Sequence, residues 1–157
     1  MYKRILLASD ETRESLVALR EGALIARALA AEAFLLIVER PTAGHRMADG
    51  VYPVPRDSKA ALELLGMGLT RLRRLGVPCR GEVVFGEPAA EIAAYAQAFQ
   101  ADLIVVGHRR RSLVERWWSG QSGAYLVDTV ACSVLVARDT ISDAEFEAYL
   151  QQTEANA

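Results

Sequence analysis

Five short apolar runs recur along the chain, and four of them are nearly unbroken rather than alternating between apolar and polar residues. They lie at residues 5–8, 33–38, 83–85, 103–106 and 134–137. A strand that is apolar on both faces is typical of a parallel sheet whose two sides are covered by helices. The runs therefore predict an α/β fold built on a parallel sheet of five strands.

The segments between these runs carry helical patterns, because apolar residues recur there every three or four positions, on one helix face. The three stripes are Leu16, Leu19, Ala23 and Ala26; Leu62, Leu65, Leu69, Leu72 and Leu75; and Ile92, Ala96 and Phe99. Helix ends are indicated by suitable capping or first-turn residues, namely Thr12, Ser58, Gly76 and Pro88. A βαβαβαβαβ order with right-handed crossovers follows, which predicts a three-layer sandwich with helices on both faces of the sheet.

Length and composition indicate one domain across residues 1–157, since 157 residues with 52% hydrophobic content can bury a single core. The formal net charge is −2, whereas a nucleic-acid-binding domain is usually strongly basic, so we expect no nucleic acid partner. No apolar stretch approaches the roughly 20 residues of a membrane span, and the first residues lack the apolar segment of a signal peptide. We therefore expect a cytoplasmic protein that binds no membrane.

Cys79 and Cys132 lie in or beside predicted strands, and neither belongs to a C-x-x-C motif or a Cys/His pair. Metal binding has little support from such spacing. We expect both cysteines to be reduced, buried small residues, and we predict no metal site.

Two segments fall outside the strand and helix pattern. Residues 41–57 contain three of the five prolines and read as a long surface loop, of the kind that often forms a lid or binding loop. Residues 140–157 begin with the capping-box pattern Ser142-Asp143-Ala144-Glu145, followed by Phe146, Tyr149 and Leu150 on one helical face. We expect this tail to be a helix docked on its own subunit or on a partner.

A glycine ends the fourth apolar run, and a second Gly/Ser cluster follows a polar loop. Gly107 is followed by His108, Arg109, Arg110 and Arg111, and then by 119-SGQSG-123. Strand-end glycines and helix starts of this kind bind anions through backbone N–H groups. Gly107 and Gly120 match two of the three glycines in the signature G-x-x-G, nine residues, G-[S/T]. That signature is the nucleotide-binding motif of the universal stress protein family.

The resemblance to this family extends over nearly the whole chain. Residues 5–10 (ILLASD) are similar to its first strand, which ends in aspartate, and residues 83–92 (VVFGEPAAEI) to its strand, G-x-P turn and helix. Residues 102–107 (DLIVVG) and 132–137 (CSVLVA) resemble its D-L-I-V-x-G and closing C-P-V-L-V-V strands. The resemblance implies an adenine nucleotide alpha hydrolase-like fold with strand order 3-2-1-4-5. It also implies a homodimer through the last strand, residues 134–138, and a stress-response role with a protein partner that the sequence does not name.

In nucleotide-binding members of the family, the first strand's aspartate lies by the adenosine, the second strand's end meets adenine, and the glycine loop holds the phosphates. The resemblance therefore implies a site for ATP, with Mg if ATP is bound, or a related adenine nucleotide, at Asp10, Val38, Gly107, Gly120, Gln121, Ser122 and Gly123. We also include the neighbouring Ala8 and Ser9, together with Arg109 and Arg110, whose guanidinium groups can contact the phosphates. Strand order 3-2-1-4-5 independently favours a ligand beyond the carboxyl ends of strands one and four. Two of these residues also have a structural alternative: Asp10 as a cap or first-turn acid and Gly120 as a helix-entry residue.

The family signature is broken at two positions. Arg110 replaces the second glycine, whose backbone can approach a phosphate closely, and Gln121 replaces the Ser or Thr. Arg109, Arg110, Arg111 and Arg116 can hold phosphate with their guanidinium groups, or they can form a solvated surface. Similarly, His108 is either solvent-facing or functional, and Trp117 and Trp118 either pack against the protein or stack on a base.

Catalytic motifs are mostly missing: the chain has no G-x-x-x-x-G-K-[ST], no G-x-S-x-G and no H-x-G-H. We therefore name no catalytic residue and do not expect an efficient enzyme; weak ATP hydrolysis is a third hypothesis, without an identified base. Two main hypotheses remain. The first is a regulatory dimer that binds ATP or a related adenine nucleotide, and the second is a nucleotide-free dimeric interaction module of the same family.

Overall fold

A parallel five-stranded sheet in the order β3-β2-β1-β4-β5 forms the centre of the computed structural model, as predicted. The structure describes residues 1–10, 13–39, 59–107, 126–138 and 140–155. All five apolar runs are confirmed as strands, each somewhat longer than its run: β1 (Arg4–Asp10), β2 (Glu32–Glu39), β3 (Cys79–Phe85), β4 (Leu103–Gly107) and β5 (Ser133–Ala137). The predicted loop over residues 41–57 lies outside the described residues.

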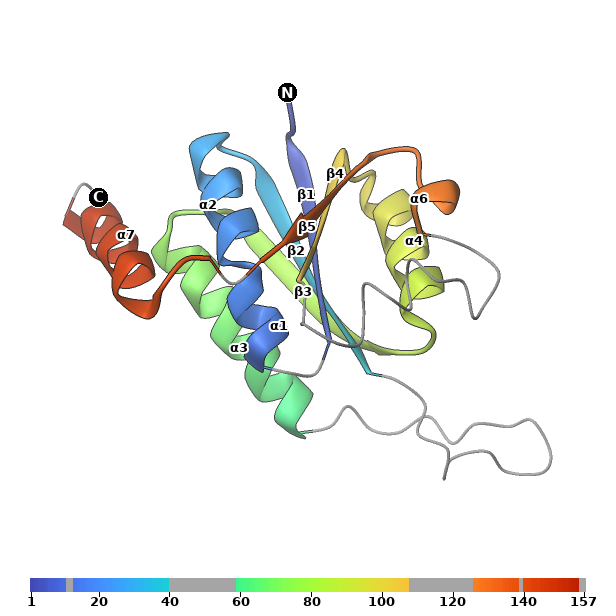
Figure 1. The fold of residues 1–157 in the computed structure, drawn as a ribbon, viewed down its shortest axis with the longest axis horizontal. Coiled ribbons are helices and arrows are strands. Elements are labelled where there is room, and N and C mark those ends of the chain that lie inside the picture. The colour runs from blue at the N-terminus through green and yellow to red at the C-terminus, as the bar shows by residue number, and fades with distance from the viewer. Residues whose placement is uncertain (11–12, 40–58, 108–125, 139, 156–157) are drawn as a thin grey trace.

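Helices cover both faces of the sheet, which confirms the three-layer prediction (Figure 1). One face carries α1 (Arg13–Ala18), α2 (Arg20–Ala28) and α3 (Lys59–Arg74), and the other carries α4 (Pro88–Phe99) and α6 (Leu126–Thr129). The first predicted helix is divided, since Leu19 separates α1 from α2. Pro88 lies in the first turn of α4, and Gly76, with φ +72°, follows the end of α3. Thr12 and Ser58, the other predicted helix-end residues, lie outside the described residues.

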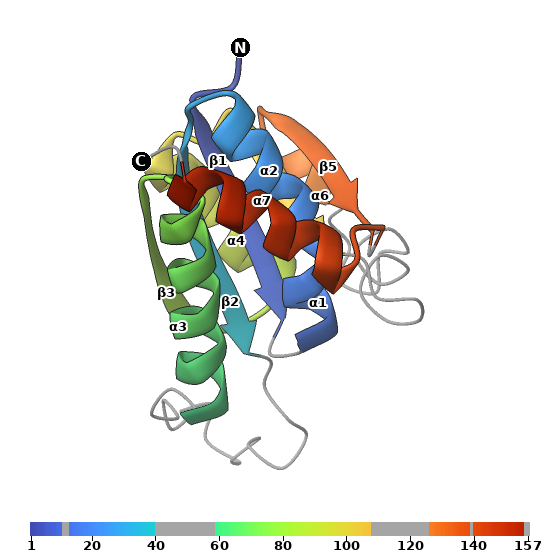
Figure 2. The same cartoon turned by 90° about the vertical axis from the view of Figure 1, so that its left-hand side faces the viewer.

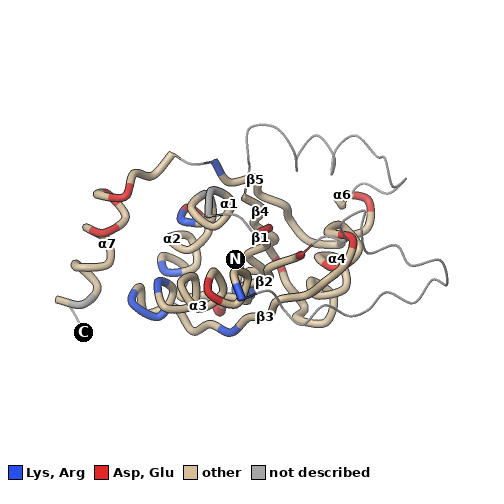
Figure 3. The backbone as a smooth tube through the Cα atoms, turned by 90° about the horizontal axis from the view of Figure 1, so that it is seen from below, with Lys and Arg blue, Asp and Glu red and all other residues tan. Residues whose placement is uncertain are grey.

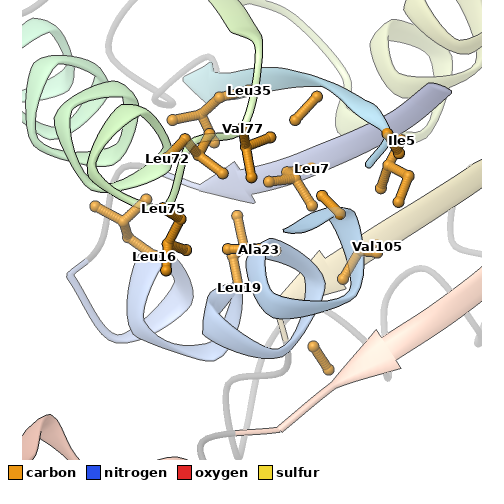
Figure 4. Close-up of a cluster of buried hydrophobic side chains, with 14 of the residues drawn as sticks. Ile5, Leu7, Leu16, Leu19, Ala23, Leu35, Leu72, Leu75, Val77 and Val105 are labelled. Atoms are coloured by element: carbon orange, nitrogen blue, oxygen red, sulfur yellow. The ribbon is translucent and has the colours of Figure 1, made fainter. Parts of the chain in front are cut away.

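The core has two halves, one on each side of the sheet. Ile5 and Leu7 of β1 face α1, α2 and α3, where Leu7, Leu16 and Leu72 lie together (Figure 4). Leu6 and Ala8 of the same strand belong to the second half, which α4 covers. Both faces of β1 are therefore buried, and this explains why its sequence is continuously apolar.

The buried face of α3 differs from the predicted stripe. Leu62 is 48% exposed, and Leu65 and Leu69 are only half-buried. Leu72 and Leu75 of the stripe are buried, as predicted, but the other buried positions of α3 are Ala61, Leu64 and Gly68. The reason is a close approach to the sheet, because a Cβ on Gly68 would lie 2.3 Å from Leu35 Cδ2. The helix turns Gly68 toward β2, and Leu62 lies on the outside.

The tail is helical, as predicted, and α7 (Asp143–Ala155) docks on its own chain as an outer layer over α2 and α3 (Figures 1 and 2). Its capping box is formed: Glu145 N donates to Ser142 Oγ (3.2 Å), and Ser142 N donates to the Glu145 carboxylate (2.8 Å). Phe146 and Leu150 are buried, whereas Tyr149 is 42% exposed. Phe146 and Leu150 are one helical turn apart, and Tyr149 falls beside their row.

Two further expectations concern the cysteines and membranes. Cys79 and Cys132 are free thiols, but both are half-buried rather than buried, because β3 and the residues before β5 lie at the two edges of the sheet. Within the described ranges, no helix has the length and apolar content that a membrane crossing requires.

Candidate functional site

The carboxyl ends of β1, β2 and β4 lie side by side at one edge of the sheet, the lower edge in Figure 1. The strand register pairs Asp10 with Val38 and Ala8 with Val106, so Gly107 follows directly beside the end of β1. The chain order reverses between β1 and β4, and open parallel sheets bind ligands at such a point. The structure thus brings together five predicted site residues: Ala8, Ser9, Asp10, Val38 and Gly107.

Buried polar side chains gather at this edge. In the part of the chain that the structure describes, four polar or charged residues are buried, and three of them belong here: Ser9 (3% exposed), Ser15 (0%) and Glu39 (7%). The fourth, Arg20, lies under α7. Polar side chains are seldom fully buried in proteins. Three of them lie where the strand order reverses, so this edge of the sheet is more polar inside than the rest of the described core.

Ser15 joins the start of α1 to the ends of β1 and β4. Asp10 N donates to Ser15 Oγ (3.3 Å), and a Cβ on Gly107 would lie 2.5 Å from Ser15 O and 2.9 Å from Ser15 Oγ. Gly107 is therefore required by the packing of α1 against β4, independently of any ligand. Ser9 Oγ donates to Asp10 O (2.9 Å), so the last two residues of β1 are joined by a side-chain hydrogen bond.

Glu39 is a site residue that the sequence analysis missed. Val38 is 2% exposed and its side chain belongs to the core under α4, which leaves only its backbone for a ligand. Glu39 is the last residue of β2, and its carbonyl accepts a hydrogen bond from Gly86 N (3.0 Å). The available signal was an acidic residue placed directly after the apolar run 33–38.

The edge also carries charges of both signs. Asp10 and Glu39 provide carboxylates, which accept hydrogen bonds from ribose hydroxyls in other parallel-sheet proteins. Arg138 is exposed and follows Ala137, the register partner of Gly107. No group of three or more His, Cys, Asp or Glu within the described ranges is placed to hold a metal ion.

The other predicted site residues lie outside the described residues. They are Arg109, Arg110, Gly120, Gln121, Ser122 and Gly123, together with His108, Trp117 and Trp118. Their predicted roles at the phosphates, and the structural alternatives to those roles, stay predictions.

Comparison with known proteins identifies the relatives of this chain. Residues 1–138 match the model of the Universal stress protein family. Universal stress protein MJ0531 of Methanocaldococcus jannaschii is 28% identical over 142 residues, covering 88% of this chain and 83% of the relative.

Solved structures share the fold at lower identity. The universal stress protein from Archaeoglobus fulgidus in complex with dAMP has a TM-score of 0.59 at 21% identity, with 87% of this chain and 98% of that chain covered. A universal stress protein family protein from Arabidopsis thaliana with AMP bound has a TM-score of 0.55 at 17% identity, with 91% and 97% covered.

Proposed function

Because the chain belongs to the universal stress protein family, we propose that it binds an adenine nucleotide at the carboxyl edge of β1, β2 and β4. One observation carries the proposal: Ser9, Ser15 and Glu39 are buried together at the switch point where parallel sheets bind ligands. The dAMP and AMP complexes of structures with this fold support the class of ligand.

The residues at this edge divide between the two ends of the nucleotide. Asp10 and Glu39 accept hydrogen bonds from the ribose or the adenine amino group. Arg138, together with Arg109 and Arg110, binds the phosphates through charge-assisted hydrogen bonds. If the nucleotide is ATP, Mg²⁺ enters with the phosphates and neutralises part of their charge.

The proposed form is a homodimer that acts in stress regulation through a protein partner in the cytoplasm. β5 pairs only with β4 among the described strands, so its other edge is open, and Val134, Leu135 and Val136 are half-buried. An open apolar edge strand is normally covered in a stable protein. Pairing of residues 134–138 with the same strand of a second subunit covers it.

Nucleotide binding is tested by mass spectrometry of the denatured purified protein and by calorimetric titration with ATP and AMP. Asp10→Asn should lose affinity by about 1 to 3 kcal/mol, the value of a hydrogen bond to a charged group. Glu63→Gln is the matched control, because Glu63 is an exposed carboxylate on α3. Absence of co-purified nucleotide, with no heat from ATP or AMP, would overturn the proposal.

The signature departures at Arg110 and Gln121 favour a second candidate, a nucleotide-free dimeric interaction module. If Arg110 binds phosphate, Arg110→Ala weakens ATP binding by about 1 to 3 kcal/mol, and binding falls as salt rises. If Arg110 instead blocks the phosphate path, the parent binds no ATP, and Arg110→Gly combined with Gln121→Ser creates binding. The same titration therefore separates the two candidates.

A further inference from the structure

α7 lies beyond residues 1–138, which match the family, and its charge is one-sided. Its sequence DAEFEAYLQQTEA contains four acidic residues and no Lys or Arg. The neighbouring surfaces of α2 and α3 carry arginines, and Figure 3 shows these basic positions beside the acidic positions of α7. The helix is thus an acidic segment bound to a basic face of the domain.

Arg20 of α2 is the centre of this contact. It is 6% exposed, its Nη1 donates to Ile141 O (2.9 Å), and its Nη2 pairs with the Asp143 carboxylate. Its guanidinium carbon lies 5.4 Å from the centre of the Phe146 ring. Arg20 Nε has no hydrogen-bond partner, so every partner of this buried cation among the described residues comes from residues 141–146.

The rest of the contact combines two apolar anchors with weaker polar bonds. Phe146 (4% exposed) closes a cavity of ≈ 20 Å³ that Leu16, Leu19 and Leu72 also line. Leu150, one turn further on, is 1% exposed. Two other arginines bind the helix: Arg74 pairs with Glu147 (2.9 Å), and Arg27 donates to Tyr149 O (3.3 Å).

We call this surface the α7 groove, defined by Arg20, Arg27, Leu19, Leu72 and Arg74. Without α7, the groove would expose Arg20, which has lost its protein acceptors, beside an uncovered apolar surface that Leu19 and Leu72 line. An occupant that offers a carbonyl, a carboxylate and an aromatic ring at the spacing of Ile141, Asp143 and Phe146 restores these acceptors and covers this surface.

We propose that the α7 groove is a docking site for an acidic amphipathic helix of a partner protein, and that α7 occupies it as a tethered competitor. Charge complementarity supports this occupant, because the arginines of the groove meet a segment with acidic residues only. α7 buries two large apolar side chains, and its outer ion pair, Arg74 with Glu147, is between 36% and 48% exposed. Exposed pairs contribute little, so the exchange of α7 requires mainly that Phe146 and Leu150 leave the groove.

The test uses a fluorescent peptide with the sequence of residues 139–157 and the full chain carrying Phe146→Ala and Leu150→Ala, which weakens its own helix. Peptide anisotropy should report binding to this variant and little binding to the unaltered chain. Adding Arg20→Met to the variant should weaken binding by about 10-fold, because the charge-assisted hydrogen bonds of Arg20 to Ile141 O and the Asp143 carboxylate are lost. Arg73→Met is the matched control, since Arg73 is an exposed arginine of α3, and it should leave affinity nearly unchanged.

Three results would overturn the proposal. The first is a folded variant that binds no peptide, and the second is peptide binding that is indifferent to Arg20. The third is loss of the parent's oligomeric state on weakening α7, which would assign the groove to the α7 of a second copy. If circular dichroism shows the variant to be unfolded, the unaltered chain is used with excess peptide. Faster hydrogen exchange of residues 143–155 is then expected, and unchanged exchange counts against the proposal.

Discussion

Gly107→Ala tests whether this glycine is required by packing, by a nucleotide, or by both. The new Cβ would lie 2.5 Å from the carbonyl oxygen of Ser15 and 2.9 Å from its hydroxyl oxygen. The nearer atom belongs to the backbone of α1, so a change of side-chain rotamer does not relieve the contact. Either α1 or the end of β4 must move, and overpacking of this kind costs about 1 to 3 kcal/mol of unfolding free energy.

Gly66→Ala is the matched control, because it makes the same chemical change in a different environment. Gly66 lies inside α3, and a Cβ there would meet no heavy atom within 4 Å. Alanine is a better helix former than glycine, so this variant should be more stable than the parent by about 0.5 to 1 kcal/mol. The two variants should therefore differ by about 1.5 to 4 kcal/mol, which is the sum of the two effects.

Urea unfolding followed by circular dichroism measures this difference, provided that the protein is first freed of nucleotide. The slope of free energy against urea concentration should be unchanged, so that the midpoints report stability directly. Equal stability of Gly107→Ala and the parent would refute the packing argument and leave a ligand as the reason for the glycine. Destabilisation without nucleotide shows that the signature glycine has a structural task as well.

Three further predictions concern single side chains. Tyr95 donates to the Glu82 carboxylate (2.5 Å), and this bond raises the pKa of Tyr95 from 10.0 to about 12. The stability that the bond contributes should persist below pH 10 and be lost between pH 10 and about 12. In the Glu82→Gln variant, phenolate absorbance should show that Tyr95 titrates at a lower pH than in the parent. Burial raises the pKa of the Cys79 and Cys132 thiols, so both should react with iodoacetamide more slowly in the folded chain than in urea. Leu135→Lys should turn the proposed dimer into monomer in light scattering, because it places a charge on the apolar edge; an unchanged dimer means another interface.

The strands could be predicted because burial of both sheet faces leaves a direct record in the sequence, whereas their order was an implication of the family resemblance. β1 contributes Ile5 and Leu7 to one core and Leu6 and Ala8 to the other, so no polar position interrupts it. The face of α3 could not be predicted in the same way. Its apolar residues cover more than one side, and the contact of Gly68 with Leu35 selects between them only after the helix meets the sheet.

The candidate site was partly predictable for a similar reason. Strand-end residues such as Asp10 and Gly107 follow from the position of each apolar run. Ser15, Arg20 and Glu39 are ordinary polar residues in the sequence, and another element determines their burial: β4 lies against Ser15, and α7 covers Arg20. Burial imposed by a distant segment has no local pattern, so sequence periodicity cannot reveal it.

The two ends of the sheet use their polar groups differently. At the amino end, the Asp102 carboxylate accepts bonds from Lys3 N (2.7 Å) and Arg4 N (3.1 Å), and Asp102 N donates to Arg4 O (3.0 Å). The acid of the DLIVVG motif thus ties β1 to β4, and a ligand there would have to break these bonds. At the carboxyl end, Asp10 is the last residue of β1 and Glu39 is the last residue of β2. Both acids lie near the point where the strand order reverses, between β1 and β4. The same fold therefore fixes its strands at one end, and the proposed binding site lies at the other.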